Sequence, residues 1–377
     1  MKIAIFSAQY PPHMGGIESF TQNLAGALAA CGDVVTVVTN DTNNQGSGWS
    51  AEAGFEILRL PCFPLIDGRF PLPKLNAVRR RLLKELAARE LDGVLVNARF
   101  YSHSILGMRF ARSKGLTPIV LDHGSAYLSF SNLILDPCVR FYEHVITELG
   151  KRYEASYYGI SQKSAEWLKT FGIKARGVIS NSIDAEKFRQ SSSGRDFRKE
   201  LNLDSSDVLV AFVGRFIPEK GIAAIVGASQ SPELIARRVV FALAGDGPLL
   251  SEVKAAVGPH LRWLGRLDKG DVSAFLQQAN VLCLPSRSEG FSTTLLEAGA
   301  CGCPAVVTDV GGARELIPDE HYGTIIESMT ASSIVAAVIN LTDNPALLLE
   351  QREKCLVLTE SSYSWSSTAR IVENTLS

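Results

Sequence analysis

Short apolar runs and longer amphipathic segments alternate along the chain. In the first half, apolar runs typical of buried strands are followed by segments with helical periodicity. The runs cover residues 2–6, 33–40, 93–97, 117–124, 155–161 and 175–180, and helical segments cover 17–32, 72–90, 162–171 and a stretch from about 102. Because strands that are separated by helices usually pair in parallel, this order predicts a doubly wound α/β sheet.

A polar, serine-rich stretch at 181–196 interrupts this order and is a candidate linker. The alternation then restarts, with apolar runs at 207–216, 238–248, 261–267, 279–286, 303–309 and 323–327. A length of 377 residues is more than one core usually takes. We therefore expect two domains that face each other across a cleft, with ligands beyond the carboxyl ends of their strands. The predicted boundary divides residues 1–182 from residues 183–361.

Composition narrows the class of protein. Hydrophobic residues make up 46% and charged residues 20%, as in a soluble globular protein. The seven cysteines have neither zinc-ligand nor redox spacing, and no apolar run reaches the length of a membrane span. We expect a cytoplasmic protein, or a peripheral one on the cytosolic face of a membrane, with no nucleic-acid partner.

Charge is unevenly divided. Residues 1–180 carry a net charge of +5 and residues 181–377 carry −6. This division either arises by chance or indicates that the first half meets an anionic membrane or a phosphorylated acceptor. The segment 73–90 combines basic and apolar residues, so it is either an amphipathic helix on an anionic membrane or a helix that covers the sheet.

Two positions in the first half lie where ligands bind. Gly15 and Gly16 precede the first helix, where backbone N–H groups and the helix N-terminus favour an anion; the alternative is an ordinary tight turn. They are not a G-x-G-x-x-G fingerprint, which argues against a nicotinamide or flavin cofactor. His123 follows an apolar strand and is either a cleft residue or a structural histidine.

The second half has three glycine-containing strand ends. Arg215 and Lys220 follow the first of them and suit a diphosphate, because a guanidinium fork and an ammonium both bind phosphate oxygens. The alternative is a solvated pair of surface cations. The segments 243–248 and 264–267 either line the same site or are only turns.

Glu289 and Glu297 flank the predicted start of a helix, for which Ser292 and Thr293 are candidate caps. With one carboxylate in the loop and the other a turn inside the helix, the spacing places them on the order of 10 Å apart. Carboxylates that cleave glycosidic bonds as a pair usually lie about 5–9.5 Å apart. We therefore expect them to hold two ends of an extended ligand. Since its neighbours are apolar, Glu297 should need a partner.

Together these segments resemble the retaining nucleotide-sugar glycosyltransferases of family four, which have the GT-B fold. The resemblance covers nearly the whole chain. It rests on "PPHMGGIE", "GRFIPEKG", "LAGDGP", "LGRL", "PSRSEGFSTTLLEAGACGCPAVVTDVGGARELI" and "YSWSSTAR". The Glu-x7-Glu element is the specific one. The resemblance implies two Rossmann-like domains, with a C-terminal helix of about 362–377 that crosses back onto the first.

The resemblance also implies roles for the site residues. Gly15 and Gly16 would face the donor diphosphate, while Arg215 and Lys220 would neutralise its phosphates. Glu297 would hold the ribose and Glu289 a hydroxyl of the transferred sugar. The backbone of Gly290, Phe291, Ser292 and Thr293 would contact sugar and phosphate, and His123 would lie near the sugar and acceptor.

The activity implied is transfer of a hexose from a nucleotide diphosphate sugar to a hydroxyl acceptor with retention of configuration. The acceptor would be a glycan or a lipid-linked sugar in bacterial surface polysaccharide synthesis. No Asp-x-Asp motif is present, so neither a required metal nor another cofactor is expected. Two alternatives stay open, a sugar-nucleotide 2-epimerase and a non-catalytic nucleotide-sugar-binding protein.

Overall fold

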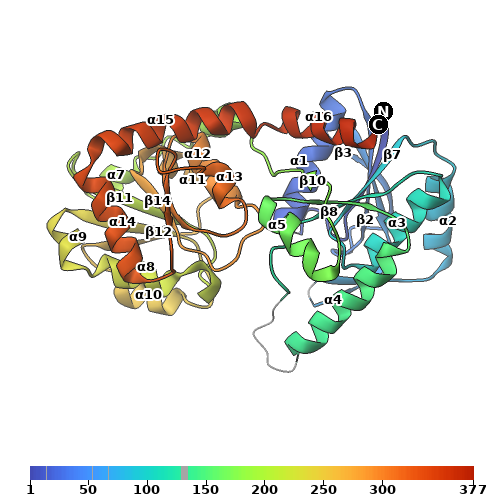
Figure 1. Ribbon diagram of the computed structural model, residues 1–377, viewed down its shortest axis with the longest axis horizontal. Coiled ribbons are helices and arrows are strands. Elements are labelled where there is room, and N and C mark those ends of the chain that lie inside the picture. Colours follow the sequence, from blue (N-terminus) through green and yellow to red (C-terminus); the bar gives the residue numbers. More distant parts are fainter. Residues whose placement is uncertain (14, 53, 67, 129–134) are drawn as a thin grey trace. The chain divides into compact units, whose positions relative to one another are not determined.

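The computed structural model describes residues 1–377 except 14, 53, 67 and 129–134. The chain divides into two compact units (Figure 1). The first contains Met1–Asn181 together with Trp365–Ser377, and the second contains Ser182–Ser364.

The first unit is built on an 8-stranded sheet in the order β10-β9-β8-β7-β1-β2-β4-β3. All neighbours are parallel except β3 and β4, and a separate hairpin joins β5 to β6. The strands are β1 Lys2–Phe6, β2 Val34–Asn40, β3 Gly48–Glu52, β4 Phe55–Leu60, β5 Cys62–Leu65, β6 Phe70–Pro73, β7 Gly93–Asn97, β8 Ile119–Asp122, β9 Ser156–Gly159 and β10 Gly177–Val178. The helices are α1 Gly16–Ala30, α2 Ala77–Ala87, α3 Ser102–Ser113, α4 Leu135–Lys151, α5 Gln162–Trp167, the 3₁₀ helix η1 Leu168–Phe171, and α16 Trp365–Leu376.

The second unit is built on a 6-stranded parallel sheet in the order β13-β12-β11-β14-β15-β16. Its strands are β11 Val208–Val213, β12 Val239–Ala244, β13 Leu261–Gly265, β14 Val281–Leu284, β15 Ala305–Thr308 and β16 Thr324–Ile326. Its helices are α6 Ala185–Gln190, α7 Phe197–Glu200, the 3₁₀ helix η2 Pro218–Lys220, α8 Ile222–Ser229, α9 Pro232–Ala236, α10 Leu250–Ala256, α11 Lys269–Gln278, α12 Thr293–Ala300, α13 Ala313–Leu316, α14 Ala331–Asp343 and α15 Pro345–Ser362.

Burial of both faces accompanies the parallel pairing that dominates the two sheets. Strands β7 and β12 are buried at every position, so both of their faces are covered and their sequences are almost continuously apolar. Helix α16, although last in the sequence, packs against α1 in the first unit. There Trp365 contacts Phe20, and Ala369 and Val372 are fully buried. The residues at the end of the chain therefore complete the core of the first unit.

Strand order reverses once in each sheet. In the first unit the order runs from β1 toward β2 on one side and toward β7 on the other. In the second unit it runs from β11 toward β12 on one side and toward β14 on the other. The loops that leave the carboxyl ends of strands at such a switch point diverge and leave room for a ligand.

Two expectations from the sequence were wrong in detail. The polar stretch at 181–196 contains helix α6, which Asp184 caps by accepting the Lys187 N–H, and which buries Ala185 and Phe188. A cap and an apolar anchor thus outweigh polar composition. The segment predicted as one helix at 72–90 contains the end of strand β6, and helix α2 begins only after Asn76.

Candidate functional site

Two loops meet at the switch point of the second unit, one after β11 and one after β14. Lys220, at the end of η2, forms an ion pair with Glu289. Ser286 donates a hydrogen bond of 2.7 Å to the same carboxylate, and the Arg287 N–H donates to the Glu219 carbonyl at 2.7 Å. The ion-paired side chains keep 22% and 15% of their surface exposed, so a ligand can reach them.

The loop that carries Glu289 is held by close backbone packing. Gly311 has a positive φ of 53°, and a Cβ there would lie 2.6 Å from the carbonyl oxygens of Glu289 and Gly290. A Cβ on Gly312 would meet the ring of Phe291 at 2.5 Å. Phe291 is itself buried and contacts Tyr363. The glycines after β15 therefore fix the position of Glu289, Gly290 and Phe291.

Helix α12 begins directly after this loop, as the sequence predicted. The Ser292 side chain accepts the Leu295 N–H at 3.3 Å, and Thr293 is the first helical residue. The other backbone N–H groups of the first turn have no helical acceptor, and the helix dipole adds partial positive charge there. The N-terminus of α12 thus follows Glu289, the carboxylate partner of Lys220, closely in the sequence, and it suits an anion.

Glu297 lies about one turn inside α12 and is half-buried. Burial raises the pKa of its carboxyl to about 7, while nearby Lys269 acts in the opposite direction. The carboxylate receives no hydrogen bond in the part of the chain that the structure describes. The expectation that Glu297 needs a partner is therefore not met by the described residues.

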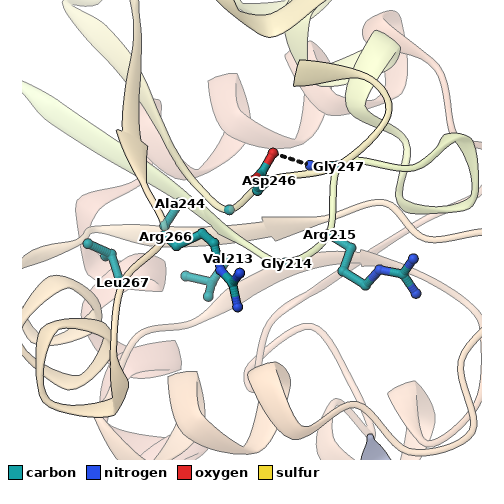
Figure 2. A pocket seen from close by; sticks show the side chains of 9 residues that line it. Val213, Gly214, Arg215, Ala244, Asp246, Gly247, Arg266 and Leu267 are labelled. Atoms are coloured by element: carbon teal, nitrogen blue, oxygen red, sulfur yellow. Dashed lines mark hydrogen bonds between the residues drawn. The ribbon is translucent and has the colours of Figure 1, made fainter. Parts of the chain in front are cut away.

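A cavity of about 500 Å³ opens at the carboxyl ends of β11, β12 and β13 (Figure 2). Its lining consists of Val213, Gly214, Arg215, Ala244, Gly245, Asp246, Gly247, Arg266 and Leu267. Arg215 and Arg266 bring two guanidinium groups to it. The Asp246 carboxylate accepts a hydrogen bond of 2.7 Å from the Gly247 N–H. The cavity therefore offers cations from the ends of β11 and β13, the strands on either side of β12.

The cavity exists because the strand ends approach without side chains between them. Gly245 has φ +148°, and a Cβ there would overlap the Gly214 carbonyl oxygen. The Gly245 N–H donates to the Gly265 carbonyl at 2.7 Å, and the Phe216 N–H donates to the Asp246 carbonyl at 2.8 Å. The segments 243–248 and 264–267, which the sequence left as site or turn, therefore contribute residues to one cavity with Arg215.

In the first unit, His123 directly follows strand β8 and contacts Asn97 at the end of β7. Its Nε2 lies 3.0 Å from Asn97 Oδ1, and Asn97 Nδ2 donates to Thr21 Oγ1 at 2.8 Å. Since the amide oxygen can only accept, Nε2 carries the proton and Nδ1 is left as an acceptor. Burial lowers the pKa of His123 to about 3, so the ring is neutral near pH 7.

The N-terminus of α1 differs from what the sequence suggested. Glu18, in its first turn, is 4% exposed, and its carboxylate lies 2.6 Å from His13 Nδ1. A Cβ on Gly15 would overlap this carboxylate, whereas Gly16 has open space around it. A carboxylate therefore already lies at the end of α1 where Gly15 and Gly16 were expected to face a diphosphate. Met14, which precedes these glycines, is outside the described residues.

Beneath His123 lies a buried ion-pair network that the sequence analysis missed. Arg99 contacts Asp122 at 2.9 Å and Glu143 at 2.7 Å, and all three side chains are at most 2% exposed. Glu143 also accepts the Leu128 N–H at 2.9 Å. The network ties the end of β8 to helix α4 and so orients the segment that carries His123. Arg99 lies two residues after β7 and Asp122 is the last residue of β8, and these positions at strand ends are the sequence signal for the network.

Helix α2 lies in the segment for which the sequence left two alternatives, a helix on an anionic membrane and a helix that covers the sheet. Leu82 and Leu86 of α2 are buried, so its apolar face covers the first unit. Arg79 is buried too, and its guanidinium donates to the Pro61 carbonyl at 3.3 Å. The apolar face of α2 thus agrees with the second alternative, a helix that covers the sheet.

The described residues bear on two requirements, those of a metal site and those of a membrane-spanning helix. Within the described residues, no group of three or more His, Cys, Asp and Glu side chains could hold a metal ion. No single helix of the same residues is long and apolar enough to cross a membrane, and the pair α14 and α15, which meets the test together, is bent by 100°.

Two units, each built on a mainly parallel α/β sheet with a switch point, have the architecture of the GT-B glycosyltransferase fold. Family models agree: residues 14–187 match "Glycosyltransferase Family 4" and residues 194–357 match "Glycosyl transferases group 1". An uncharacterised glycosyltransferase of Methanocaldococcus jannaschii is 31% identical over 68% of this chain and 68% of its own length. The chain belongs to the glycosyltransferases, in the group that family four represents.

Further relatives cover nearly the whole chain. A GDP-mannose-dependent alpha-(1-6)-phosphatidylinositol monomannoside mannosyltransferase of Mycobacterium tuberculosis is 23% identical over 97% of this chain and 93% of its own. A sucrose-phosphate synthase of Thermosynechococcus elongatus superposes with a TM-score of 0.77, with 20% identity over 99% and 98% of the two chains. A UDP complex of HepE from Anabaena superposes with a TM-score of 0.75, with 16% identity over 100% and 99%. These structures share the fold.

Proposed function

We propose that the protein transfers a hexose from a nucleotide diphosphate sugar to a hydroxyl acceptor with retention of configuration. We further propose that the acceptor is a glycan or a lipid-linked sugar used in surface polysaccharide synthesis. Supporting this, the Mycobacterium tuberculosis relative is described as acting on a phosphatidylinositol mannoside, and an Escherichia coli relative is described as a UDP-Gal:alpha-D-GlcNAc-diphosphoundecaprenol galactosyltransferase.

The observation that carries the proposal is the Lys220–Glu289 pair beside the N-terminus of α12. A sugar diphosphate presents negative oxygens next to neutral hydroxyls. Lys220 would bind the phosphate oxygens together with the N–H groups of α12, while Glu289 would accept a hydrogen bond from a sugar hydroxyl. Because the two side chains touch, they would grip the donor where its phosphate joins its sugar.

The nucleoside end of the donor would extend away from that pair. We assign the ribose hydroxyls to Glu297, whose half-buried carboxylate has unused hydrogen-bond capacity. Arg215, which lines the neighbouring cavity, would bind the phosphates from the other side. The backbone of Gly290, Phe291, Ser292 and Thr293 would complete the contacts to sugar and phosphate.

Departure of the nucleotide diphosphate would be driven by electrostatic stabilisation of the leaving phosphates. Arg215, Lys220 and the α12 N-terminus supply positive charge where negative charge develops, and this is usually the largest catalytic contribution. We therefore propose that the reaction needs no metal ion. A donor phosphate oxygen would take the acceptor proton as the acceptor attacks the face from which the nucleotide leaves.

The first unit would contribute neutral hydrogen-bond acceptors. His123 stays uncharged and presents Nδ1, which suits a sugar or acceptor hydroxyl. Gly16 leaves open space at the start of α1, but the Glu18 carboxylate opposes an anion there. We therefore retain Gly15 and Gly16 as donor contacts only through close approach of the backbone.

The test is a panel of nucleotide sugars incubated with the protein, with release of free nucleotide measured in the presence and absence of lipid extract. We expect release that depends on the acceptor and survives EDTA. A sugar-nucleotide 2-epimerase would instead convert the nucleotide sugar without an acceptor, and a non-catalytic binding protein would bind the donor but release nothing. A stable glycosyl adduct on Glu289 would contradict the proposed mechanism.

A further inference from the structure

Large apolar side chains are exposed on one small part of the first unit. Hairpin β5–β6 and the start of α2 expose six of them, which we call the hairpin patch: Phe63 (53%), Leu65 (45%), Ile66 (53%), Leu72 (37%), Leu75 (87%) and Val78 (38%). Leu75 is the most exposed large hydrophobic side chain in the described part of the chain. Contiguous exposed apolar surface on a soluble protein usually marks an interaction site.

Strand pairing places these side chains on a common face. Phe63 is directly opposite Leu72, and Leu65 is opposite Phe70. Residues that face each other across an antiparallel pair, and residues two apart on one strand, point to the same side. Phe63, Leu65, Phe70 and Leu72 therefore share one face of the hairpin. Phe70 is half-buried there against Tyr101 and Tyr142, while the other three are exposed.

The hairpin is held in place by a buried arginine. Arg79 is 5% exposed and donates to the Pro61 carbonyl just before β5, and the Lys74 N–H donates to the same carbonyl at 3.1 Å. The two ends of the hairpin are thus bonded to each other, and the Pro61 end is also bonded to the first turn of α2. The apolar side chains are consequently presented on a formed element.

Basic side chains lie on the same segments as the hairpin patch. Arg69, Arg80 and Lys84 are exposed and make no ion pair with any residue that the structure describes. Lys74 Nζ lies 4.9 Å from the centre of the Phe63 ring, which leaves an ammonium beside an exposed aromatic group. Between residues 60 and 84 the sequence holds six Lys and Arg and one Asp. An apolar centre with an unneutralised basic rim complements an anionic bilayer.

Helix α4 extends the apolar surface. Phe141 (72%), Val145 (42%) and Leu149 (39%) are spaced four residues apart and form an exposed stripe along one side of the helix. Tyr142 of this helix contacts Phe70 of the hairpin, with ring centroids 5.3 Å apart. The stripe and the hairpin patch therefore belong to neighbouring elements of the same unit.

We propose that the hairpin patch inserts into the headgroup region of an anionic membrane, with Lys74, Arg80 and Lys84 against the lipid phosphates. The proposal rests on the proposed function, because a lipid-linked acceptor would be presented at that surface. It moves the membrane contact from the body of helix α2, which covers the sheet, to the hairpin before it. The contact requires neither donor nor acceptor.

The experiment is co-sedimentation of the full chain with phosphatidylglycerol vesicles and with phosphatidylcholine vesicles. Phe63→Ser/Leu65→Ser should bind phosphatidylglycerol vesicles roughly tenfold or more weakly than the unaltered chain. Leu349→Ser/Val357→Ser removes two similarly exposed side chains from α15 in the second unit and should bind as the unaltered chain does. Arg80→Gln should weaken binding about fivefold and only at low salt.

A second readout locates the contact. Leu65→Trp should show a blue-shifted emission with phosphatidylglycerol vesicles, quenched by brominated acyl chains, whereas Val357→Trp should show neither effect. Equal vesicle binding by the hairpin and α15 variants, or no binding by the unaltered chain, would overturn the proposal. So would a concentration-dependent dimer that Phe63→Ser/Leu65→Ser abolishes, since a second copy would then be the occupant.

The two proposals fail separately. Nucleotide release with a water-soluble acceptor reports on transfer alone and should be the same for Phe63→Ser/Leu65→Ser and the unaltered chain. Loss of vesicle binding with transfer intact supports the membrane contact. Vesicle binding by a chain that transfers no sugar would refute the proposed function while leaving the contact in place.

Discussion

Lys220 and Glu289 are 69 residues apart in sequence, yet they form an ion pair because β11 and β14 are neighbours in the sheet. Glu297, only eight residues from Glu289, has no such partner among the described residues, and burial raises the pKa of its carboxyl to about 7. Two carboxylates of one motif therefore have different environments. The ion-paired Glu289 suits a position where the sugar joins the phosphate. Glu297, whose pKa is raised to about 7, suits a position where a bound ligand supplies the missing hydrogen bonds.

These environments predict different failures for the two alanine variants. Glu297→Ala should weaken binding of the free nucleotide about tenfold, because it removes a charged hydrogen-bond acceptor for the ribose. Glu289→Ala should leave nucleotide binding unchanged or tighter, since Lys220 loses its competing carboxylate, while turnover of the sugar donor falls roughly a hundredfold. Calorimetry and nucleotide release measure the two effects, with exposed Glu353→Ala as the control; equal loss of nucleotide binding in both variants would reject this assignment.

The raised pKa of Glu297 also predicts a pH dependence. The folded protein keeps this carboxyl protonated up to about pH 7, whereas the unfolded chain releases the proton near pH 4.5, so stability falls as the pH rises through that window. Glu297→Gln should therefore be more stable than the unaltered chain by ~1–3 kcal/mol at pH 8 and equal to it below pH 4.5. Denaturant unfolding at both pH values measures this. A stability difference that does not change with pH would contradict the assigned pKa.

At the scale of elements, the site is made by strand ends and the turns that follow them. Glycines let the chain after β11, β12 and β13 come close enough to share hydrogen bonds, and this leaves the cavity beside Arg215. Gly245 and Gly265 both have positive φ, but only Gly245 faces a backbone carbonyl. A side chain added at Gly265 therefore meets only the unfavourable backbone conformation, whereas one added at Gly245 also collides with the Gly214 carbonyl.

Gly265→Ala should cost about 1 kcal/mol, because open space surrounds it and only the left-handed conformation is penalised. Gly245→Ala should cost roughly 3 kcal/mol or more and should also weaken nucleotide binding, because the Gly214 carbonyl has to move. Urea unfolding and calorimetry compare the two variants. If both lose the same stability, close approach of the strand ends is not what the glycine provides.

At the scale of the molecule, the chain returns at its end to the unit in which it started. Helix α16 packs on α1, and Thr368 Oγ1 donates to the Ser180 carbonyl at 3.4 Å. The first unit is therefore incomplete until the last residues are made. Each unit otherwise has a sheet, a switch point and polar side chains at its strand ends.

This arrangement predicts where a defect in the last helix is felt. Ala369→Asp places an unpaired carboxylate at a fully buried position and should destabilise the first unit by about 3 kcal/mol, whereas Ile371→Asp, 44% exposed on the same helix, should cost little. Hydrogen exchange should show faster opening in residues 1–181 for Ala369→Asp, with residues 182–364 unchanged. Faster exchange in the second unit instead would contradict the assignment of α16 to the first.

Periodicity and motifs alone determined the α/β class, all six strands of the second unit and the capped start of α12. They could do so because buried parallel strands and N-caps are local patterns. The sequence did not indicate the hairpins, the burial of Arg79, the Glu18 carboxylate at α1 or the Arg99 network. Each of these depends on partners at least several residues away and on which face of an element meets the core.

The same division holds within the candidate site. The types of residue at strand ends follow from the sequence, because the carboxyl edge of a parallel sheet is where ligands bind. The pairing of Lys220 with Glu289, the tautomer of His123, the isolation of Glu297 and the exposed hairpin patch were decided by tertiary structure. Hydrogen bonding, desolvation and exposure belong to a side chain's surroundings, and only the folded chain creates those surroundings.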